Sequence, residues 1–183
     1  MKPIKTSYRG FKFRSRLEAR WGIFFDKLGL RWEYEPQGYV LPGDIPYLPD
    51  FKLILPGDEI VYCEVNNGEA DDFDPQETRK LRLFSNEIGC KVILLTSVPE
   101  YRAYNQVAPG LPSNSFQTVF FRDYEPYIGV VDEYWSQVLK LNSRTGRLEF
   151  DLDDRAVRKA FGRGFVEAVG AAKAATFEHG ESP

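Results

Sequence analysis

The chain has few of the residues that build histidine-based or cysteine-based sites. It contains one histidine, His179 near the C-terminal end, and two cysteines, Cys63 and Cys90. A structural zinc site needs more ligands than these, and two isolated thiols suit buried free cysteines better than a disulfide framework. We therefore expect neither a zinc site nor a histidine-based mechanism.

Long apolar runs are also missing. No stretch approaches the roughly 20 apolar residues that span a bilayer, and the basic, aromatic N-terminus has no apolar block of the kind found in signal peptides. These absences predict a soluble, cytoplasmic protein with no membrane partner. A chain of 183 residues can bury one substantial core, so we expect a single domain over residues 1–183.

The net charge of −3 hides a strong asymmetry along the chain. Residues 1–31 carry nine Lys and Arg against two acids, whereas residues 32–78 carry one lysine against twelve acids. The remaining residues are nearly balanced. A basic arm followed by an acidic region is typical of a protein that binds phosphates with one part and metal cations with another, although a merely solvated charge distribution gives the same composition.

Periodicity and capping residues divide the chain into alternating helices and strands. Ser15 and Gly29 bracket a helical apolar pattern, Pro56-Gly57-Asp58 marks a hairpin turn, and Asp74-Pro75-Gln76-Glu77 is typical of a helix start. A strand, a helix and a further apolar strand indicate a parallel crossover. The expected elements are helices over 16–28, 75–88, 132–141 and 153–175, strands over 32–40, 51–55, 59–65, 91–96 and 116–121, and a loop over 99–115.

The hairpin delivers one carboxylate from each of its strands. Asp50 precedes the first strand, and Glu64 lies in the second, on the same face as Tyr62 and Asn66 because side chains alternate along a strand. Carboxylates are hard oxygen ligands that suit Mg²⁺, and the backbone carbonyl of Val65 could add a third oxygen. The sequence therefore predicts a divalent-metal site, provided that Asp50 meets Glu64.

These residues, taken in order, resemble the PD-(D/E)XK nuclease superfamily. The hairpin matches its motif in Pro49-Asp50 and in Glu64-Val65-Asn66, fourteen residues after Asp50. More specifically, residues 8–21, the Trp-Glu-Tyr-Glu-Pro segment at 32–36 and the Tyr-Leu-Pro-Asp-Phe segment at 47–51 resemble a group of small nucleases encoded by phages and mobile elements. The tail at 177–181 is similar to their C-terminal ending. The resemblance is strong over residues 8–96 and thin beyond them.

The resemblance implies a restriction-endonuclease-like α/β fold, in which helices flank a mixed central β-sheet. It implies a core over about 8–96, with a C-terminal extension over about 116–183. The implied activity is Mg²⁺-dependent cleavage of DNA phosphodiesters, with Mn²⁺ able to substitute, in the cytoplasm of a bacterial host. Asp50 and Glu64 would hold the metal, and Glu18 on the first helix would supplement them. A surface pairing of Glu18 with a local arginine such as Arg14 is an equally common alternative.

One position departs from the family pattern. Asn66 stands where the family places a lysine that orients the attacking water, and asparagine carries no positive charge. A lysine could come from elsewhere, and we favour Lys80 over Lys91. Alternatively, Asn66 suffices, as other superfamily members manage with Gln, Glu or Asn. Finally, the chain could be a catalytically impaired DNA-binding protein.

Basic residues near the N-terminus are the best candidates for contacts with DNA phosphates. Such contacts release counterions and make binding salt-dependent, but they carry no base specificity. A homodimer is possible because double-strand cleavage needs two sites. A globular protein without nuclease activity, whose acidic strands are simply solvated, is the remaining alternative. The candidate DNA contacts are Arg9, Lys12, Arg14, Arg16 and Arg20.

Overall fold

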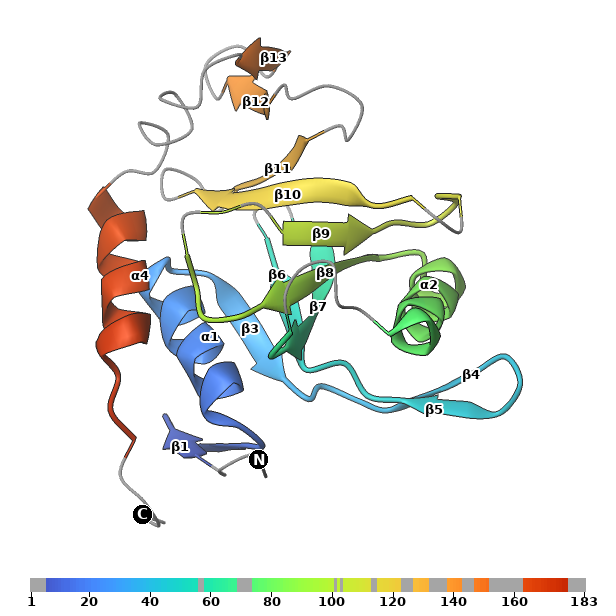
Figure 1. The fold of residues 1–183 in the computed structure, drawn as a ribbon, viewed down its shortest axis with the longest axis horizontal. Helices are drawn as coiled ribbons and strands as arrows, with labels where there is room; N and C mark the ends of the chain where they lie inside the picture. Colours follow the sequence, from blue (N-terminus) through green and yellow to red (C-terminus); the bar gives the residue numbers. More distant parts are fainter. Residues whose placement is uncertain are drawn as a thin grey trace.

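A mixed β-sheet forms the centre of the protein (Figure 1). The structure is a computed structural model that describes residues 6–55, 58–68, 74–100, 102, 104–112, 115–122, 127–131, 138–142, 147–151 and 163–177. Nine strands follow the order β13-β12-β11-β10-β9-β8-β7-β6-β3. Only β7 and β8 pair in parallel. The strands are β3 (Arg31–Tyr34), β6 (Phe51–Ile54), β7 (Ile60–Asn66), β8 (Lys91–Thr96), β9 (Tyr104–Val107), β10 (Gln117–Arg122), β11 (Tyr127–Val131), β12 (Val138–Asn142) and β13 (Arg147–Asp151).

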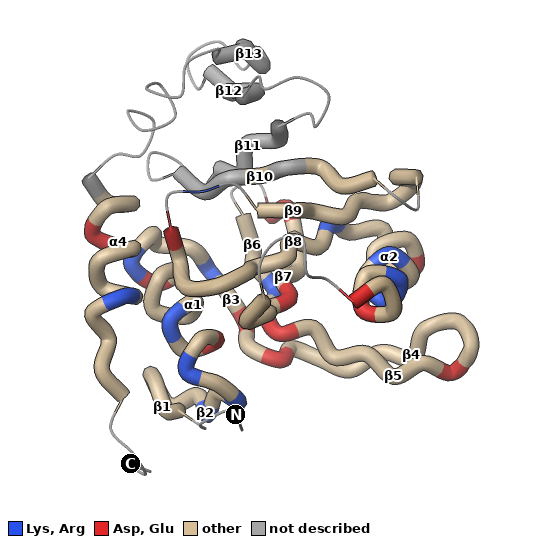
Figure 2. The backbone as a smooth tube through the Cα atoms, viewed as in Figure 1, with Lys and Arg blue, Asp and Glu red and all other residues tan. Residues whose placement is uncertain are grey.

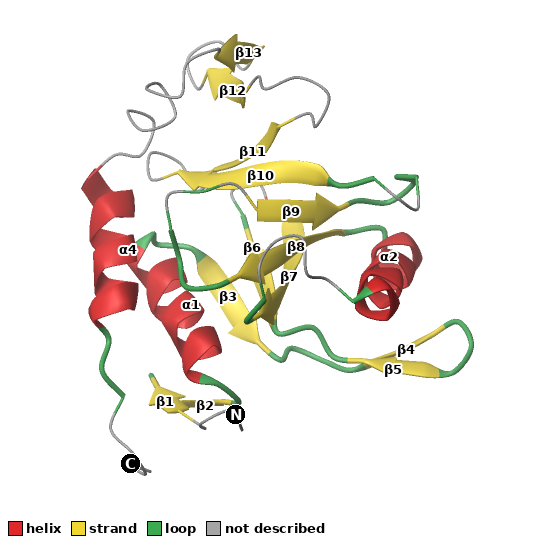
Figure 3. Cartoon of the chain, viewed as in Figure 1, coloured by secondary structure: helices red, strands yellow, loops and turns green. Residues whose placement is uncertain are grey.

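Three helices belong to the described chain, and local signals explain the ends of the first two. Helix α1 (Arg16–Lys27) begins at Ser15, whose side chain accepts a hydrogen bond from the Glu18 N–H. Helix α2 (Pro75–Ile88) begins at Asp74, which caps Gln76, and ends at Gly89 in the left-handed conformation. Helix α4 (Arg163–Ala174) follows the strands. Figure 3 shows α1 and α4 together on one side of the sheet and α2 on the other.

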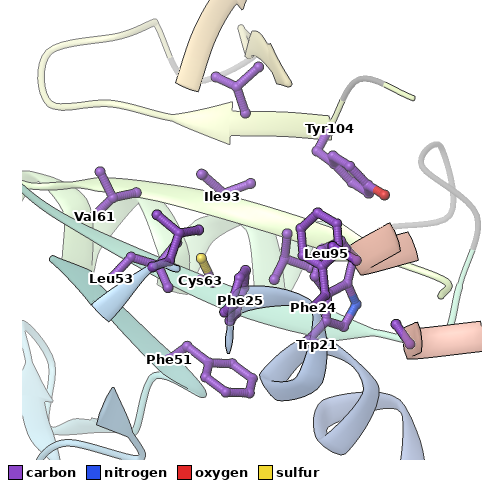
Figure 4. Packing of buried hydrophobic residues seen from close by; sticks show 14 of the residues in the cluster. Trp21, Phe24, Phe25, Phe51, Leu53, Val61, Cys63, Ile93, Leu95 and Tyr104 are labelled. Carbon is purple, nitrogen blue, oxygen red and sulfur yellow. The ribbon is translucent and has the colours of Figure 1, made fainter. Parts of the chain in front are cut away.

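Alternation along the central strands divides the core into two clusters. Cys63 of β7 and Ile93 of β8 pack with α1 and α4, whereas Tyr62 and Leu94 pack with α2. Figure 4 shows aromatic side chains of α1, including Trp21, directed at the sheet. The sheet is therefore covered on both faces, and the predicted α/β class with a mixed sheet flanked by helices is confirmed.

Helix α4 belongs to the same core as α1. The Phe165 ring meets the Phe24 ring edge-on at a centroid separation of 5.4 Å, and Phe165 is fully buried. The hydrophobic core thus extends beyond the predicted 8–96 region into the C-terminal segment. Whether residues 1–183 act as one functional unit stays a prediction.

Two short hairpins lie outside the main sheet. Strands β1 (Thr6–Tyr8) and β2 (Phe11–Phe13) pair beside α1, and β4 (Tyr39–Leu41) pairs with β5 (Ile45–Tyr47) below α2 (Figure 1). The strand expected over 32–40 is therefore two strands of different sheets. It breaks at Glu35, whose φ of 44° is incompatible with a continuing strand.

Two further expectations need correction. The loop expected over 99–115 contains β9, because Val92 and Leu94 of β8 offer a sheet edge that β9 pairs with. The helix expected over 132–141 is wrong at its end, where Val138–Asn142 is a strand paired with β13. The last helix, expected over 153–175, is described over Arg163–Ala174, and its expected first part is untested. Residues 132–137 and 152–162 lie outside the described residues. The other helices and strands that the sequence predicted all occur, within two residues at their ends.

Candidate functional site

The β6–β7 hairpin brings Asp50 and Glu64 together. Phe51 pairs with Cys63 in the antiparallel register, which places Asp50 opposite Glu64 just beyond the end of β6. A backbone hydrogen bond from the end of β3 also fixes the position of Asp50, because the Glu35 N–H donates to the Asp50 carbonyl at 2.9 Å. The condition set by the sequence, that Asp50 meets Glu64, is therefore met.

Asp50 is almost completely buried, with 2% of its surface exposed, yet both carboxylate oxygens have partners. Oδ2 accepts a hydrogen bond from the Val65 N–H at 2.7 Å, and Oδ1 contacts the Arg14 guanidinium. Burial raises the pKa of Asp50 to about 6, although the Val65 N–H and Arg14 both act to lower it. The fold therefore keeps a carboxylate where ionisation is unfavourable.

Glu64 is the second perturbed acid of the pair. Its Oε2 accepts a hydrogen bond at 2.8 Å from the hydroxyl of Tyr47, a buried residue at the end of β5. Burial and then the charge of Asp50 raise the pKa of Glu64 to about 8, while the Tyr47 hydroxyl acts to lower it. A buried acid pair, in which the charge of Asp50 raises the pKa of Glu64, favours a bound cation that would relieve the repulsion.

Glu18 approaches this pair from α1 but is fixed by its own neighbours. Its Oε2 accepts from the Tyr34 hydroxyl at 2.5 Å and from the Arg14 N–H at 3.1 Å, and its Oε1 accepts from the Ser15 hydroxyl at 2.8 Å. Glu18 is 7% exposed, so it is no surface acid. Its charge is close enough to act on the pKa of Asp50.

The arginine Arg14 links the two parts of the site. Its Nη2 contacts Asp50, its Nε lies 2.7 Å from Glu35 Oε1, and the same Nε lies 4.0 Å from Glu18 Oε2. Half of the Arg14 side chain (52%) is exposed, whereas only 3% of the Asp50 side chain is. The guanidinium therefore lies between the carboxylates and the solvent.

Asn66 stands where the PD-(D/E)XK resemblance would place a lysine, and it takes part in a local turn. Its Oδ1 accepts from the Gly68 N–H at 3.0 Å, and its carbonyl accepts from the Ser97 N–H at 3.2 Å. These contacts give Asn66 a structural role at the end of β7.

The two replacement lysines differ in position. Lys80 on α2 lies 2.7 Å from Glu77, and the charges of Glu77 and then Glu64 raise its pKa. Lys91 pairs with Glu59 at 2.8 Å and lies opposite Val61, three residues before Glu64 along β7 and thus about 10 Å away along the strand. The structure therefore places Lys80, and not Lys91, on the Glu64 side of the sheet.

The five basic residues expected to contact DNA do not form one free surface. Arg16 donates to the Phe177 carbonyl at 3.3 Å, and Arg20 donates to the Lys173 and Ala175 carbonyls at 3.2 and 3.3 Å. These contacts hold the end of α4 against α1. Arg9 pairs with Asp26 at 2.5 Å, and Lys12 is exposed. Figure 2 shows basic residues along α1 and acidic residues beside β7.

The donor set fits a hard divalent cation in its chemistry. Asp50 and Glu64 offer carboxylates from adjacent strands, and Mg²⁺ needs few protein ligands because it keeps several waters. The Val65 N–H faces Asp50, so the carbonyl of the same residue is directed to that side of the strand. Within the described ranges, however, no three His, Cys, Asp or Glu residues come together as a metal-binding group. The three-carboxylate set implied by the resemblance is thus not assembled, because Glu18 is fixed by Tyr34 and Ser15.

Comparisons with protein-family models, curated proteins and solved structures found no match. In the described part of the chain, no helix has both the length and the apolar character that crossing a bilayer requires.

Sequence reasoning missed three side chains that complete the site and the contact of a fourth, Arg14, with Asp50. Tyr34 and Tyr47 donate to the acids, Glu35 anchors Arg14, and Arg14 itself lies against Asp50. Tyr34 alternates with Glu33 and Glu35, which is a weak signal, whereas Tyr47 stands between Pro46 and Leu48 and carries none. The sequence offered Arg14 as a partner of Glu18 and as a DNA contact, but no signal pointed to its contact with Asp50.

Proposed function

We propose that this protein is a metal-dependent DNA endonuclease with a restriction-endonuclease-like fold. One observation carries the proposal: two carboxylates from paired strands lie side by side, partly or fully buried, with pKa values raised to about 6 and about 8. A fold retains such an unfavourable pair where a cation binds, and perturbed acids of this kind gather at functional sites. The β-hairpin, crossover helix and covering helix also agree with the PD-(D/E)XK resemblance.

In this proposal, Asp50 and Glu64 hold Mg²⁺, with the Val65 carbonyl as a further oxygen. Glu18, whose carboxylate is held by Tyr34 and Ser15, acts on the site through its charge and not as a ligand. When bound, Mg²⁺ supplies Lewis-acid neutralisation of the phosphate and lowers the pKa of a water. Hydrolysis places the hydroxyl of water on phosphorus and a proton on the leaving oxygen. Mn²⁺, which also accepts carboxylate and water ligands, is expected to substitute.

The positive charge that the family takes from its motif lysine is assigned to Lys80. Its ammonium lies on the α2 side of the sheet, where Glu64 also points, and the two groups interact electrostatically. This role requires the Lys80 ammonium to leave Glu77, from which it lies 2.7 Å. Lys12 and Arg9 are the exposed cations proposed for the DNA backbone.

A nicking assay tests the proposal. Supercoiled DNA is incubated with the protein and Mg²⁺ or Mn²⁺, and cleavage is expected for the wild type but not for Asp50→Asn or Glu64→Gln. Asp58→Asn is the matched control, because Asp58 is an exposed acid at the far end of the same hairpin. Cleavage that survives both active-site substitutions would refute the assignment.

A second candidate function is DNA binding without cleavage. It is favoured by Asn66, whose amide oxygen is used by the Gly68 turn and which cannot supply charge. Salt-sensitive binding of DNA by the wild type, with no cleavage in either metal and no gain from Asn66→Lys, would establish this alternative. Absence of both DNA binding and metal binding would reject both functions.

A further inference from the structure

Arg14 meets the carboxylate cluster in the place where a cation would bind. Its guanidinium contacts Asp50, lies 2.7 Å from Glu35 and approaches Glu18 to 4.0 Å. Three acids thus surround one positive group. The Asp50 carboxylate contacts Arg14, its positively charged partner, and the Val65 N–H.

A metal ion at Asp50 and this guanidinium cannot share one oxygen without a large repulsion. Oδ2 of Asp50 accepts from the Val65 N–H, so Oδ1 is the carboxylate oxygen that is not bound to the backbone, and Arg14 contacts Oδ1. Two positive charges within a few ångströms of each other repel strongly in a partly buried site.

We propose that Arg14 is the resident counter-ion of the metal-free site and that it competes with the divalent cation for Asp50. This inference rests on the proposed metal site and adds its regulation: metal binding requires that Arg14 leave Oδ1. The Arg14 side chain can leave Asp50 because half of it is exposed and its Nε already contacts Glu35, whose side chain is more exposed than that of Asp50 (28% against 3%). Arg14 is therefore not a metal ligand. It weakens metal binding as long as its guanidinium stays on Asp50 Oδ1.

Competition predicts an unusual result, in which removing a site residue strengthens metal binding. A charge-assisted contact of this kind corresponds to about tenfold to a hundredfold in affinity. Titration calorimetry of the full chain with Mn²⁺, without DNA, is expected to show at least about tenfold tighter binding for Arg14→Gln than for the wild type. A merely structural role for Arg14 would leave the affinity unchanged or weaken it.

The control separates local competition from a general change in charge. Arg31→Gln removes the same charge from another Arg–Asp ion pair, the one with Asp58 at 2.8 Å, at the opposite end of the hairpin. Its Mn²⁺ affinity is expected to match the wild type. Equal increases in both variants would overturn the inference, because they would reflect net charge alone.

A second variant protects the test against misfolding. Arg14→Lys keeps the charge, but one ammonium cannot reproduce the separate contacts of Nη2 with Asp50 and Nε with Glu35, so its affinity is expected to lie between those of the wild type and Arg14→Gln. Wild-type or weaker affinity in folded Arg14→Lys and Arg14→Gln would overturn the competition. No Mn²⁺ binding by any protein, including the wild type, would instead reject the proposed metal site itself.

Discussion

Replacing Asp50 with asparagine is expected to stabilise the metal-free protein at neutral pH. The pKa of Asp50 is raised from 3.8 to about 6 by burial, so ionising it in the folded protein costs about 3 kcal/mol more than in the unfolded chain. Asparagine keeps an oxygen that can accept from the Val65 N–H at the same place. It carries no charge, so the cost of ionisation is absent.

The pH dependence gives the prediction its sign. A carboxyl whose pKa is raised on folding binds more protons in the folded state, so the wild type loses stability as pH rises from about 4 to about 6. The advantage of Asp50→Asn is then about 1 kcal/mol at about pH 4.5 and about 3 kcal/mol at about pH 7.5, an upper limit because Arg14 loses one partner. Since the Asp50 charge also raises the pKa of Glu64, its removal acts in the same direction.

Urea unfolding followed by tryptophan fluorescence measures this effect in the presence of a chelator. Trp21 is fully buried in the core, so its emission reports the loss of tertiary structure. Asp58→Asn is the control, because an exposed acid in a surface ion pair contributes little. An Asp50→Asn protein less stable than the wild type at about pH 7.5, or a gain that is equal at both pH values, would refute the reasoning.

Three further predictions concern neighbouring side chains. Lys80→Met is expected to reduce cleavage of supercoiled DNA at least about tenfold whereas Lys91→Met leaves it unchanged, and equal losses would exclude a special role for Lys80. Tyr47→Phe removes the hydroxyl that acts to lower the pKa of Glu64, so Mn²⁺ affinity measured by calorimetry at neutral pH is expected to fall about tenfold, and an unchanged affinity would contradict this. Phe51→Ala is expected to lower the free energy of unfolding in urea by about 3 to 5 kcal/mol, because Phe51 is fully buried among aromatic rings, and a loss below about 1 kcal/mol would argue against that packing.

The elements that position the site were predictable because their signals are local. Ser15 caps α1, Asp74 caps α2, and the Asp58 N–H donates to the Leu55 carbonyl between β6 and β7, each within a few residues of the element concerned. The alternation of β7 correctly assigned Tyr62 and Cys63 to opposite faces. The Asp50–Glu64 contact followed from the same register.

Elements without such signals were harder to predict. In strand β12, the apolar residues Val138 and Leu139 stand among polar neighbours in a pattern that also fits a short helix. Only the pairing of this segment with β13 shows that it is a strand. Likewise, β9 lies in a segment rich in turn residues and is a strand because β8 offers it an edge. Long-range pairing overrode local preference in both cases.

The electrostatics of the site depend on contacts that no local pattern encodes. Asp50 and Arg14 are 36 positions apart, and the guanidinium reaches the carboxylate because Ser15 starts α1 next to the end of β6. The buried acids would otherwise destabilise the fold, and one half-exposed arginine offsets part of this repulsion while remaining displaceable. A permanently buried partner for Asp50 would stabilise the fold further but would exclude a metal ion. The half-exposed position of Arg14 therefore reconciles folding without metal with the proposed binding of metal.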